Sequence, residues 1–129
     1  MQTILHIEDN ADHARLVRRI LEPHGYQLLH ASDGESGLRM AVENKPALIL
    51  LDLGLPDVDG QTLIGLLKSM PEVAQTPLVA LTAWPSDTGE RMAKAYGCDG
   101  YIAKPISARE FPSQIAAYLR KPRETNGIS

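Results

Sequence analysis

The sequence has little cysteine and no long hydrophobic run. Cys98 is its only cysteine, so no disulfide can form within the chain, and a single thiol suits the reducing cytosol. The longest apolar run, Ala47 to Leu51, is far too short to cross a bilayer. The first residues also lack the basic and apolar segments of a signal peptide. We therefore expect a cytoplasmic protein with no membrane partner.

The chain carries no strong charge of either sign. Its formal net charge is −3 and its isoelectric point is near 5.8, so we expect no direct nucleic-acid partner. With 43% hydrophobic and 22% charged residues, the composition is that of a globular protein rather than a disordered one. We predict one domain over residues 1–120, followed by a polar tail or the start of a linker at 121–129.

Short apolar runs alternate with longer amphipathic segments along the chain. The runs predict strands at Thr3–Ile7, Tyr26–Ala31, Ala47–Leu51, Leu78–Leu81 and Tyr101–Ala103. Apolar residues at helical spacing predict helices at about Ala11–Pro23 and around Thr88–Tyr96. Three further helices are marked by Leu38, Ala41 and Val42, by Leu63, Leu66 and Leu67, and by Ile115, Ala116 and Leu119. This alternation indicates an α/β fold of the flavodoxin-like, doubly wound type. Its five-stranded parallel sheet has the order 2-1-3-4-5, with five helices on both faces.

The last predicted helix contains an unexpected proline. Pro112 removes a backbone donor and crowds the carbonyl of Ala108, so we expect that helix to start late or to kink. Ser107 and Glu110 have the spacing of a capping box just before it.

Polar side chains stand at the ends of four predicted strands. They are Glu8 and Asp9 after the first strand, Asp52 after the third, Thr82 after the fourth and Lys104 after the fifth. Each alone has an ordinary explanation as a turn residue, a strand residue or a surface charge. Because the carboxyl ends of parallel strands meet at one edge of the sheet, their joint placement instead favours a single pocket.

Such a pocket has a definite chemistry. Three clustered carboxylates raise each other's pKa, and a hard divalent cation such as Mg²⁺ relieves their repulsion. Asp52 can then act as a nucleophile toward a phosphoryl group. Lys104 and Thr82 can contact the phosphoryl oxygens.

Four segments resemble the motifs of response-regulator receiver domains of two-component signalling, a fold also seen in chemotaxis receivers. They are Ile4–Asn10, Leu51–Gly60, Leu81–Ala83 and Gly100–Ile106, in the order and at the spacing of that family. The resemblance covers about residues 3–120. It implies a phosphoprotein that is not an enzyme and that works in a phosphorelay.

The resemblance also implies roles for single residues. Asp52 would accept a phosphoryl group from a histidine kinase or histidine phosphotransfer protein. Asp9, Asp52 and the backbone carbonyl of Gly54 would bind Mg²⁺ directly, and Glu8 would act through water. Glu8 stands where many members carry Asp, and its longer arm still allows that contact.

The same family likeness implies a switch. Thr82 and Tyr101 would reorient on activation, and a downstream protein would bind the face of the fourth helix, fifth strand and fifth helix. The Lys104–Pro105 peptide bond would be cis and would aim the lysine into the pocket.

Three alternatives differ in class from this reading. An aspartyl-nucleophile phosphohydrolase usually has an acid–base carboxylate two residues after the nucleophile, where this chain has Gly54. A flavodoxin-like cofactor binder is disfavoured because no Gly-x-Gly-x-x-Gly loop follows the first strand. A receiver-like module that binds partners without phosphorylation stays open.

The remaining side chains of note have simpler interpretations. We expect His6 to pack in the core or against a helix, and Cys98 to be a buried small residue. His13, His24 and His30 show no ligand spacing and are expected at the surface. Trp84, the only tryptophan, either anchors its loop by packing or leans over the mouth of the pocket.

Overall fold

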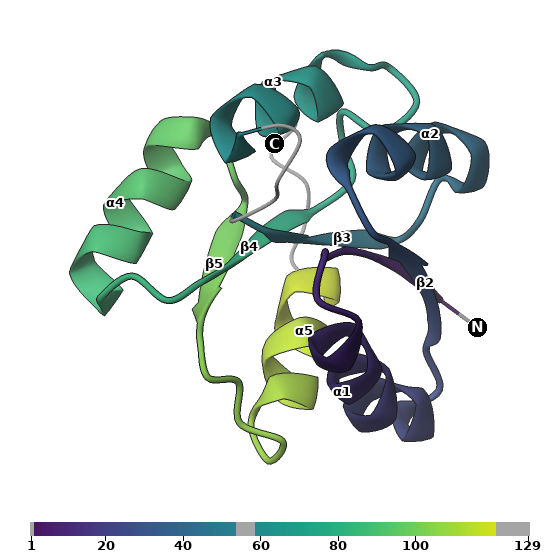
Figure 1. The fold of residues 1–129 in the computed structure, drawn as a ribbon, viewed down its shortest axis with the longest axis vertical. Helices are drawn as coiled ribbons and strands as arrows, with labels where there is room; N and C mark the ends of the chain where they lie inside the picture. The colour runs from purple at the N-terminus through teal and green to yellow at the C-terminus, as the bar shows by residue number, and fades with distance from the viewer. Residues whose placement is uncertain (1, 54–58, 121–129) are drawn as a thin grey trace.

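The computed structural model describes residues 2–53 and 59–120 of the chain (Figure 1). One parallel sheet runs through it in the order β2-β1-β3-β4-β5. Its strands are β1 (Thr3–Ile7), β2 (Gln27–Ala31), β3 (Leu48–Asp52), β4 (Leu78–Thr82) and β5 (Gly100–Ala103). The helices are α1 (Ala11–Leu21), α2 (Gly34–Asn44), α3 (Gly60–Ser69), α4 (Ser86–Tyr96) and α5 (Phe111–Arg120), with a 3₁₀ turn η1 (Glu22–His24) after α1. The predicted flavodoxin-like fold and strand order are confirmed.

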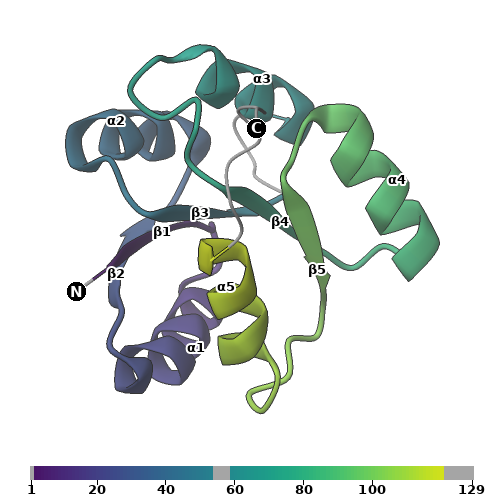
Figure 2. The same cartoon turned by 180° about the vertical axis from the view of Figure 1, so that it is seen from behind.

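The helices cover both faces of the sheet. Helices α1 and α5 lie on one face and α2, α3 and α4 on the other, as the two opposite views show (Figures 1 and 2). Each face of the sheet has its own hydrophobic core. Alternate residues of a strand belong to different cores, because successive side chains of a strand point to opposite faces. Leu5 and Ile7 join the α2–α3 core, whereas Ile4 joins the α1–α5 core. No helix within the described ranges combines the length and apolar character that crossing a membrane needs.

Strand β3 lies at the centre of the sheet and is buried along its whole length. It ends one residue later than the apolar run predicts, because Asp52 still pairs with Leu81 of β4. In the same way, β4 extends to Thr82, which pairs with Ala103 of β5. Asp52 and Thr82 therefore belong to the sheet itself, which fixes the positions of their backbones.

Two prolines set helix boundaries. Helix α1 ends at Leu21 rather than at Pro23, which lies in the 3₁₀ turn, and Gly25 then adopts a φ of 91° that suits glycine. Helix α5 starts at Phe111, so Pro112 lies in its first turn, where the missing donor has no intrahelical partner. The late start predicted for this helix is confirmed. The N–H of Glu110 donates to the Ser107 hydroxyl at 3.3 Å, which is half of the predicted capping box.

Cys98 lies between α4 and β5 and is partly buried. Burial, aided by the negative charge of Asp99, raises the pKa of its thiol from 9.0 to about 12. The folded state thus favours the neutral thiol. The stability that this contributes is complete below about pH 9 and is lost as the pH rises toward 12.

We predict that Cys98 of the folded protein reacts slowly with iodoacetamide at pH 8, because only the thiolate is a good nucleophile. Unfolding in urea should restore the rate of an ordinary thiol. Alkylation followed by mass spectrometry measures both rates, and equal rates in the two states would show that the fold does not suppress the thiolate.

Candidate functional site

The carboxyl ends of four neighbouring strands bring the predicted site residues together. The register pairs Ile7 of β1 with Leu51 of β3, and the β3–β4 and β4–β5 ladders continue to Asp52 and Thr82. Glu8 follows β1 directly and Lys104 follows β5 directly. Side chains from four strand ends therefore face one edge of the sheet, as the sequence predicted.

Three carboxylates form an acidic group at this edge. Glu8, Asp9 and Asp52 each offer a carboxylate oxygen, and these three atoms lie within 4.8 Å of one another. Glu8 is 1% exposed and Asp52 8% exposed, while Asp9 is open to solvent. This set of hard oxygen donors with one open side fits Mg²⁺, which binds a few carboxylates and keeps several waters. Gly54, the fourth predicted ligand, lies outside the described residues.

A lysine approaches the central carboxylate from the other side. The Nζ atom of Lys104 lies 3.2 Å from Oδ1 of Asp52, and the Lys104–Pro105 peptide bond is cis, as the family likeness implied. Because Asp52 is nearly buried, its ion pair with Lys104 is screened less than a surface pair would be.

A cavity of about 240 Å³ opens beside this ion pair. Asp52, Thr82 and Lys104 provide its polar lining, and Trp84 is one of its apolar lining residues. The backbone N–H of Trp84 donates a hydrogen bond to Oγ1 of Thr82 at 3.0 Å. Since that bond uses a lone pair of the hydroxyl oxygen, the hydroxyl proton can be donated to an oxygen in the cavity.

Trp84 shows the packing role that the sequence left open, and it is also one of the residues that line the cavity. Its ring contacts Tyr96 of α4 edge to face, with ring centroids 6.4 Å apart. The same residue lines the cavity next to Asp52. Packing on Tyr96 thus fixes an apolar group at the rim of the site.

Tyr101 lies between the site and α4. A Cβ atom placed on Gly89 of α4 would be 3.1 Å from Cε2 of Tyr101 and 3.4 Å from Cγ2 of Thr82. The Tyr101 ring and the Thr82 methyl group therefore both face the glycine. On the α5 side, the Tyr118 hydroxyl donates to the backbone carbonyl of Tyr101 at 3.3 Å. Both predicted switch residues thus lie close to Gly89 of α4.

Two of the histidines correct the sequence-based expectation. His13 and His30 were predicted at the surface, but both are half-buried and both bind Glu8. Nδ1 of His13 lies 2.6 Å from Oε1 of Glu8, and Nε2 of His30 lies 2.7 Å from the Glu8 carbonyl oxygen. His6 is buried, as expected, and His24 is exposed. The register of the first two strands places His6 opposite His30, and the spacing of the histidines in the sequence does not reveal that register.

These contacts decide the charge of Glu8. Burial acts to raise its pKa, but polar contacts with His6, Asp52 and His13 and the N–H of Asn10 outweigh it and hold the pKa well below its usual range. Glu8 is therefore ionised at neutral pH. Burial lowers the pKa of His6, against the pull of the Glu8 carboxylate, so that this ring is neutral.

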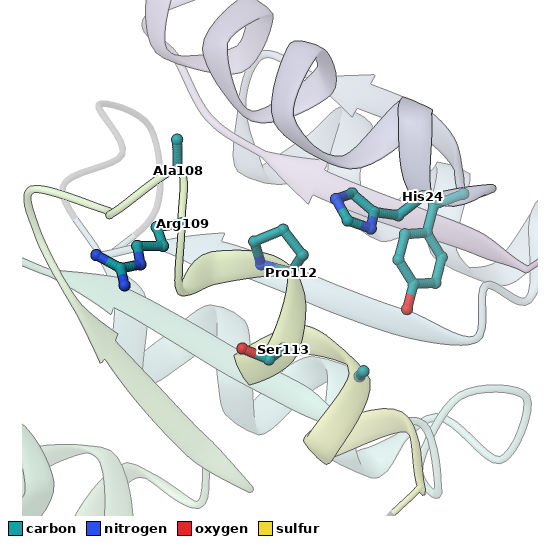
Figure 3. A pocket seen from close by; sticks show the side chains of 7 residues that line it. His24, Ala108, Arg109, Pro112 and Ser113 are labelled. Atoms are coloured by element: carbon teal, nitrogen blue, oxygen red, sulfur yellow. The ribbon is translucent and has the colours of Figure 1, made fainter.

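A second, larger cavity has no comparable chemistry. It measures about 380 Å³ and lies where the start of α5 faces His24, with Pro112, Ser113 and Arg109 along its side (Figure 3). Its lining includes no carboxylate and none of the predicted site residues. The acidic edge of the sheet therefore remains the candidate site.

The comparisons with known proteins identify the family of this chain. A family model described as the response regulator receiver domain matches residues 4–116. The polar-differentiation response regulator DivK of Brucella anthropi is 35% identical over 118 residues, which cover 92% of this chain and 96% of that protein.

Two solved receiver domains of histidine kinases have the same fold. That of a signal transduction histidine kinase from Syntrophus aciditrophicus is 30% identical, with a TM-score of 0.84, and covers 100% of this chain and 98% of its own. That of sensor histidine kinase PA1611 from Pseudomonas aeruginosa is 27% identical, with a TM-score of 0.83, and covers 93% and 98%. The latter was solved with a magnesium ion coordinated in its active-site cleft. This chain is thus a member of the response-regulator receiver domain family, which works in two-component signalling with histidine kinases or phosphotransfer proteins.

Proposed function

We propose that this chain is a phosphorylation switch in which Asp52 accepts a phosphoryl group from a histidine kinase or a histidine phosphotransfer protein. The observation that carries the proposal is the position of Asp52. It lies between an acidic group formed with Glu8 and Asp9 and the Lys104 ammonium 3.2 Å away. Phosphoryl transfer needs a nucleophilic carboxylate with an ammonium close to it and with further carboxylates that can hold Mg²⁺.

Each side chain of the site would have its own role in phosphoryl transfer. A carboxylate oxygen of Asp52 attacks phosphorus, and the bond from phosphorus to the donor atom breaks with its electron pair leaving on the donor. The Lys104 ammonium and the Thr82 hydroxyl are placed along the same cavity to hold phosphoryl oxygens. Mg²⁺, held by Asp9 and Asp52 and through water by Glu8, would neutralise further negative charge on these oxygens. Gly54 would add its backbone carbonyl to that set, although it lies outside the described residues.

The test is phosphorylation of the full chain by acetyl phosphate, followed by intact-mass spectrometry, with Mg²⁺ and with EDTA. We expect addition of one phosphoryl group that requires Mg²⁺. No addition under either condition would favour the alternative of a module that binds partners without phosphorylation. A profile of histidine kinases as donors then identifies the partner.

The proposed role is signalling rather than turnover of a substrate. A phosphohydrolase with an aspartyl nucleophile would use a carboxylate two residues after Asp52, and that position is Gly54. We therefore propose that the chain is not an enzyme. Residues 1–120 would form the receiver unit and 121–129 a tail or linker that lies outside the described residues. The cytoplasmic location and the lack of nucleic-acid and membrane partners stay predictions.

We propose that the signal leaves through the face formed by α4, β5 and α5, where a downstream protein binds. Phosphorylation would draw the Thr82 hydroxyl toward the phosphoryl group and open room beside it, so that Tyr101 moves inward, which shifts an existing equilibrium. Gly89 supports this idea, because the absence of a side chain there leaves the Tyr101 ring close to the helix. The hydrogen bond from Tyr118 to the Tyr101 carbonyl links the same movement to α5.

Amide hydrogen exchange with and without beryllofluoride measures this switch. We predict that protection changes are concentrated in α4, β5 and α5, and that Asp52→Asn shows none of them. Changes restricted to α1 and α2 would contradict the proposed output face.

Trp84 is predicted to shield the phosphorylated site. Trp84 is one of the residues that line the cavity beside Asp52, where a bulky apolar side chain would hinder the in-line approach of water to the phosphoryl group. Trp84→Ala should still be phosphorylated but should lose the phosphoryl group about threefold faster or more. The intrinsic fluorescence of the parent should also change when Mg²⁺ and beryllofluoride bind. An unchanged phosphate lifetime together with flat fluorescence would leave Trp84 with its packing role alone.

A further inference from the structure

A second group of ligand-type side chains shares Glu8 with the acidic group. Nε2 of His6 lies 3.6 Å and Nδ1 of His13 lies 2.6 Å from Oε1 of Glu8. The three atoms lie within 4.8 Å of one another. His6 and Glu8 point the same way because they are two residues apart at the end of β1, and the first turn of α1 brings His13 beside them.

His6 is the unexplained member of this group. Its side chain is 1% exposed, and neither ring nitrogen has a hydrogen-bond partner among the described residues. The distance of 3.6 Å to Glu8 is too long for a hydrogen bond. A buried imidazole with both nitrogens unpaired is unfavourable, and such groups call for an explanation such as a bound ion. Since Nε2 of His6 is the ring atom nearest to Oε1 of Glu8, a cation between these two atoms would give each of them a partner.

We infer that His6, Glu8 and His13 form a binding site for Zn²⁺ that shares Glu8 with the proposed magnesium site. Two imidazole nitrogens and one carboxylate oxygen, with a fourth position left to water, are a common tetrahedral zinc set. Mg²⁺ prefers oxygen ligands alone, so the two sites differ in selectivity.

The geometry is close to what the ion needs. A tetrahedral zinc ion with bonds of about 2 Å keeps its ligand atoms about 3.3 Å apart. The observed distances of 3.6 and 2.6 Å to Glu8 lie on either side of that value. His13 is 20% exposed, so its ring can turn from the hydrogen bond with Glu8 toward a metal. His30 holds the Glu8 carbonyl and acts as a positioning residue for the site rather than as a ligand.

Sharing of Glu8 gives the zinc site a regulatory consequence. A zinc ion bound to Glu8 would lie next to Asp9 and Asp52, and its positive charge would repel a magnesium ion there. It would also occupy a carboxylate that the magnesium site would use. The two metals should therefore weaken each other's binding, and this coupling is reciprocal. Zinc binding itself does not require phosphorylation of Asp52.

Calorimetric titration of the untagged full chain with Zn²⁺ tests the inference. We expect one zinc ion per chain, and His13→Ala should weaken its binding about tenfold or more. His24→Ala is the matched control, because His24 is exposed and lies outside the cluster, and it should bind zinc as the parent does. Asp52→Asn should also retain zinc, which separates this site from the acidic group. Thermal unfolding of each variant confirms that it is folded.

Cobalt provides an independent readout. Co²⁺ in a tetrahedral site of nitrogen and oxygen ligands absorbs visible light strongly, so the parent should show this absorption and His13→Ala should lose it. Failure of the parent to bind zinc, or equal affinity of the parent and His13→Ala, would overturn the inference. So would loss of zinc in Asp52→Asn with retention in His13→Ala. Retained zinc binding in a chain that acetyl phosphate does not label would contradict the proposed function alone.

Discussion

Asp52→Asn should abolish phosphorylation by acetyl phosphate in the presence of Mg²⁺, with a loss of about a hundredfold or more. The amide nearly matches the carboxylate in shape, so the side chain still fits the end of β3, where it is 8% exposed. It carries no negative charge and is a poor nucleophile toward phosphorus. The variant thus removes the chemistry of the residue while it preserves the packing, and intact-mass spectrometry measures the result.

Asp12→Asn is the matched control for this prediction. Asp12 lies in the first turn of α1, its side chain is 88% exposed, and it pairs with Arg15 rather than with any site residue. The same chemical change there should leave phosphorylation as it is in the parent. If Asp52→Asn were labelled as fully as Asp12→Asn, Asp52 could not be the acceptor.

Asp9→Ala should lower the affinity for Mg²⁺ by about tenfold or more, because it removes one of three clustered oxygen donors. Asp9 is open to solvent and lies just outside β1, so the fold should tolerate the change. Phosphorylation at limiting Mg²⁺ should fall in parallel. Calorimetry with Mg²⁺ measures the affinity directly.

The control here removes the same charge nearby. Asp12→Ala lowers the negative charge of the same loop and helix without touching the acidic group, so it reports only the general electrostatic field. We expect it to change Mg²⁺ affinity far less than Asp9→Ala does. Equal losses in the two variants would mean that Asp9 is not a direct ligand.

The fold and most of the site could be predicted from the sequence for a simple physical reason. The central strands are covered on both faces, so they appear as apolar runs, and each run ends where a polar side chain reaches the edge of the sheet. This pattern located Glu8, Asp9, Asp52, Thr82 and Lys104 and the edge that they share. It missed the last residues of β3 and β4 because backbone pairing with a neighbouring strand continues after the apolar run stops.

Contacts between elements were harder to predict. The cluster around Glu8 depends on the register between β1 and β2 and on the rotation of α1 about its axis, and neither is visible in the spacing of the histidines. The proximity of Gly89 to Tyr101 likewise depends on how closely α4 approaches β5. Glycine is a weak helix former, but in the structure the lack of a side chain at Gly89 lets the Tyr101 ring lie close to α4.

The most direct test of the account locates the phosphoryl group in the unmodified chain. The protein is phosphorylated with acetyl phosphate and Mg²⁺ and then reduced with borohydride, which converts a phosphorylated aspartate into homoserine, and its peptides are sequenced by mass spectrometry. We predict homoserine at position 52 and at no other aspartate. A phosphoryl group on Asp9, on His13 or on any residue other than Asp52 would contradict it.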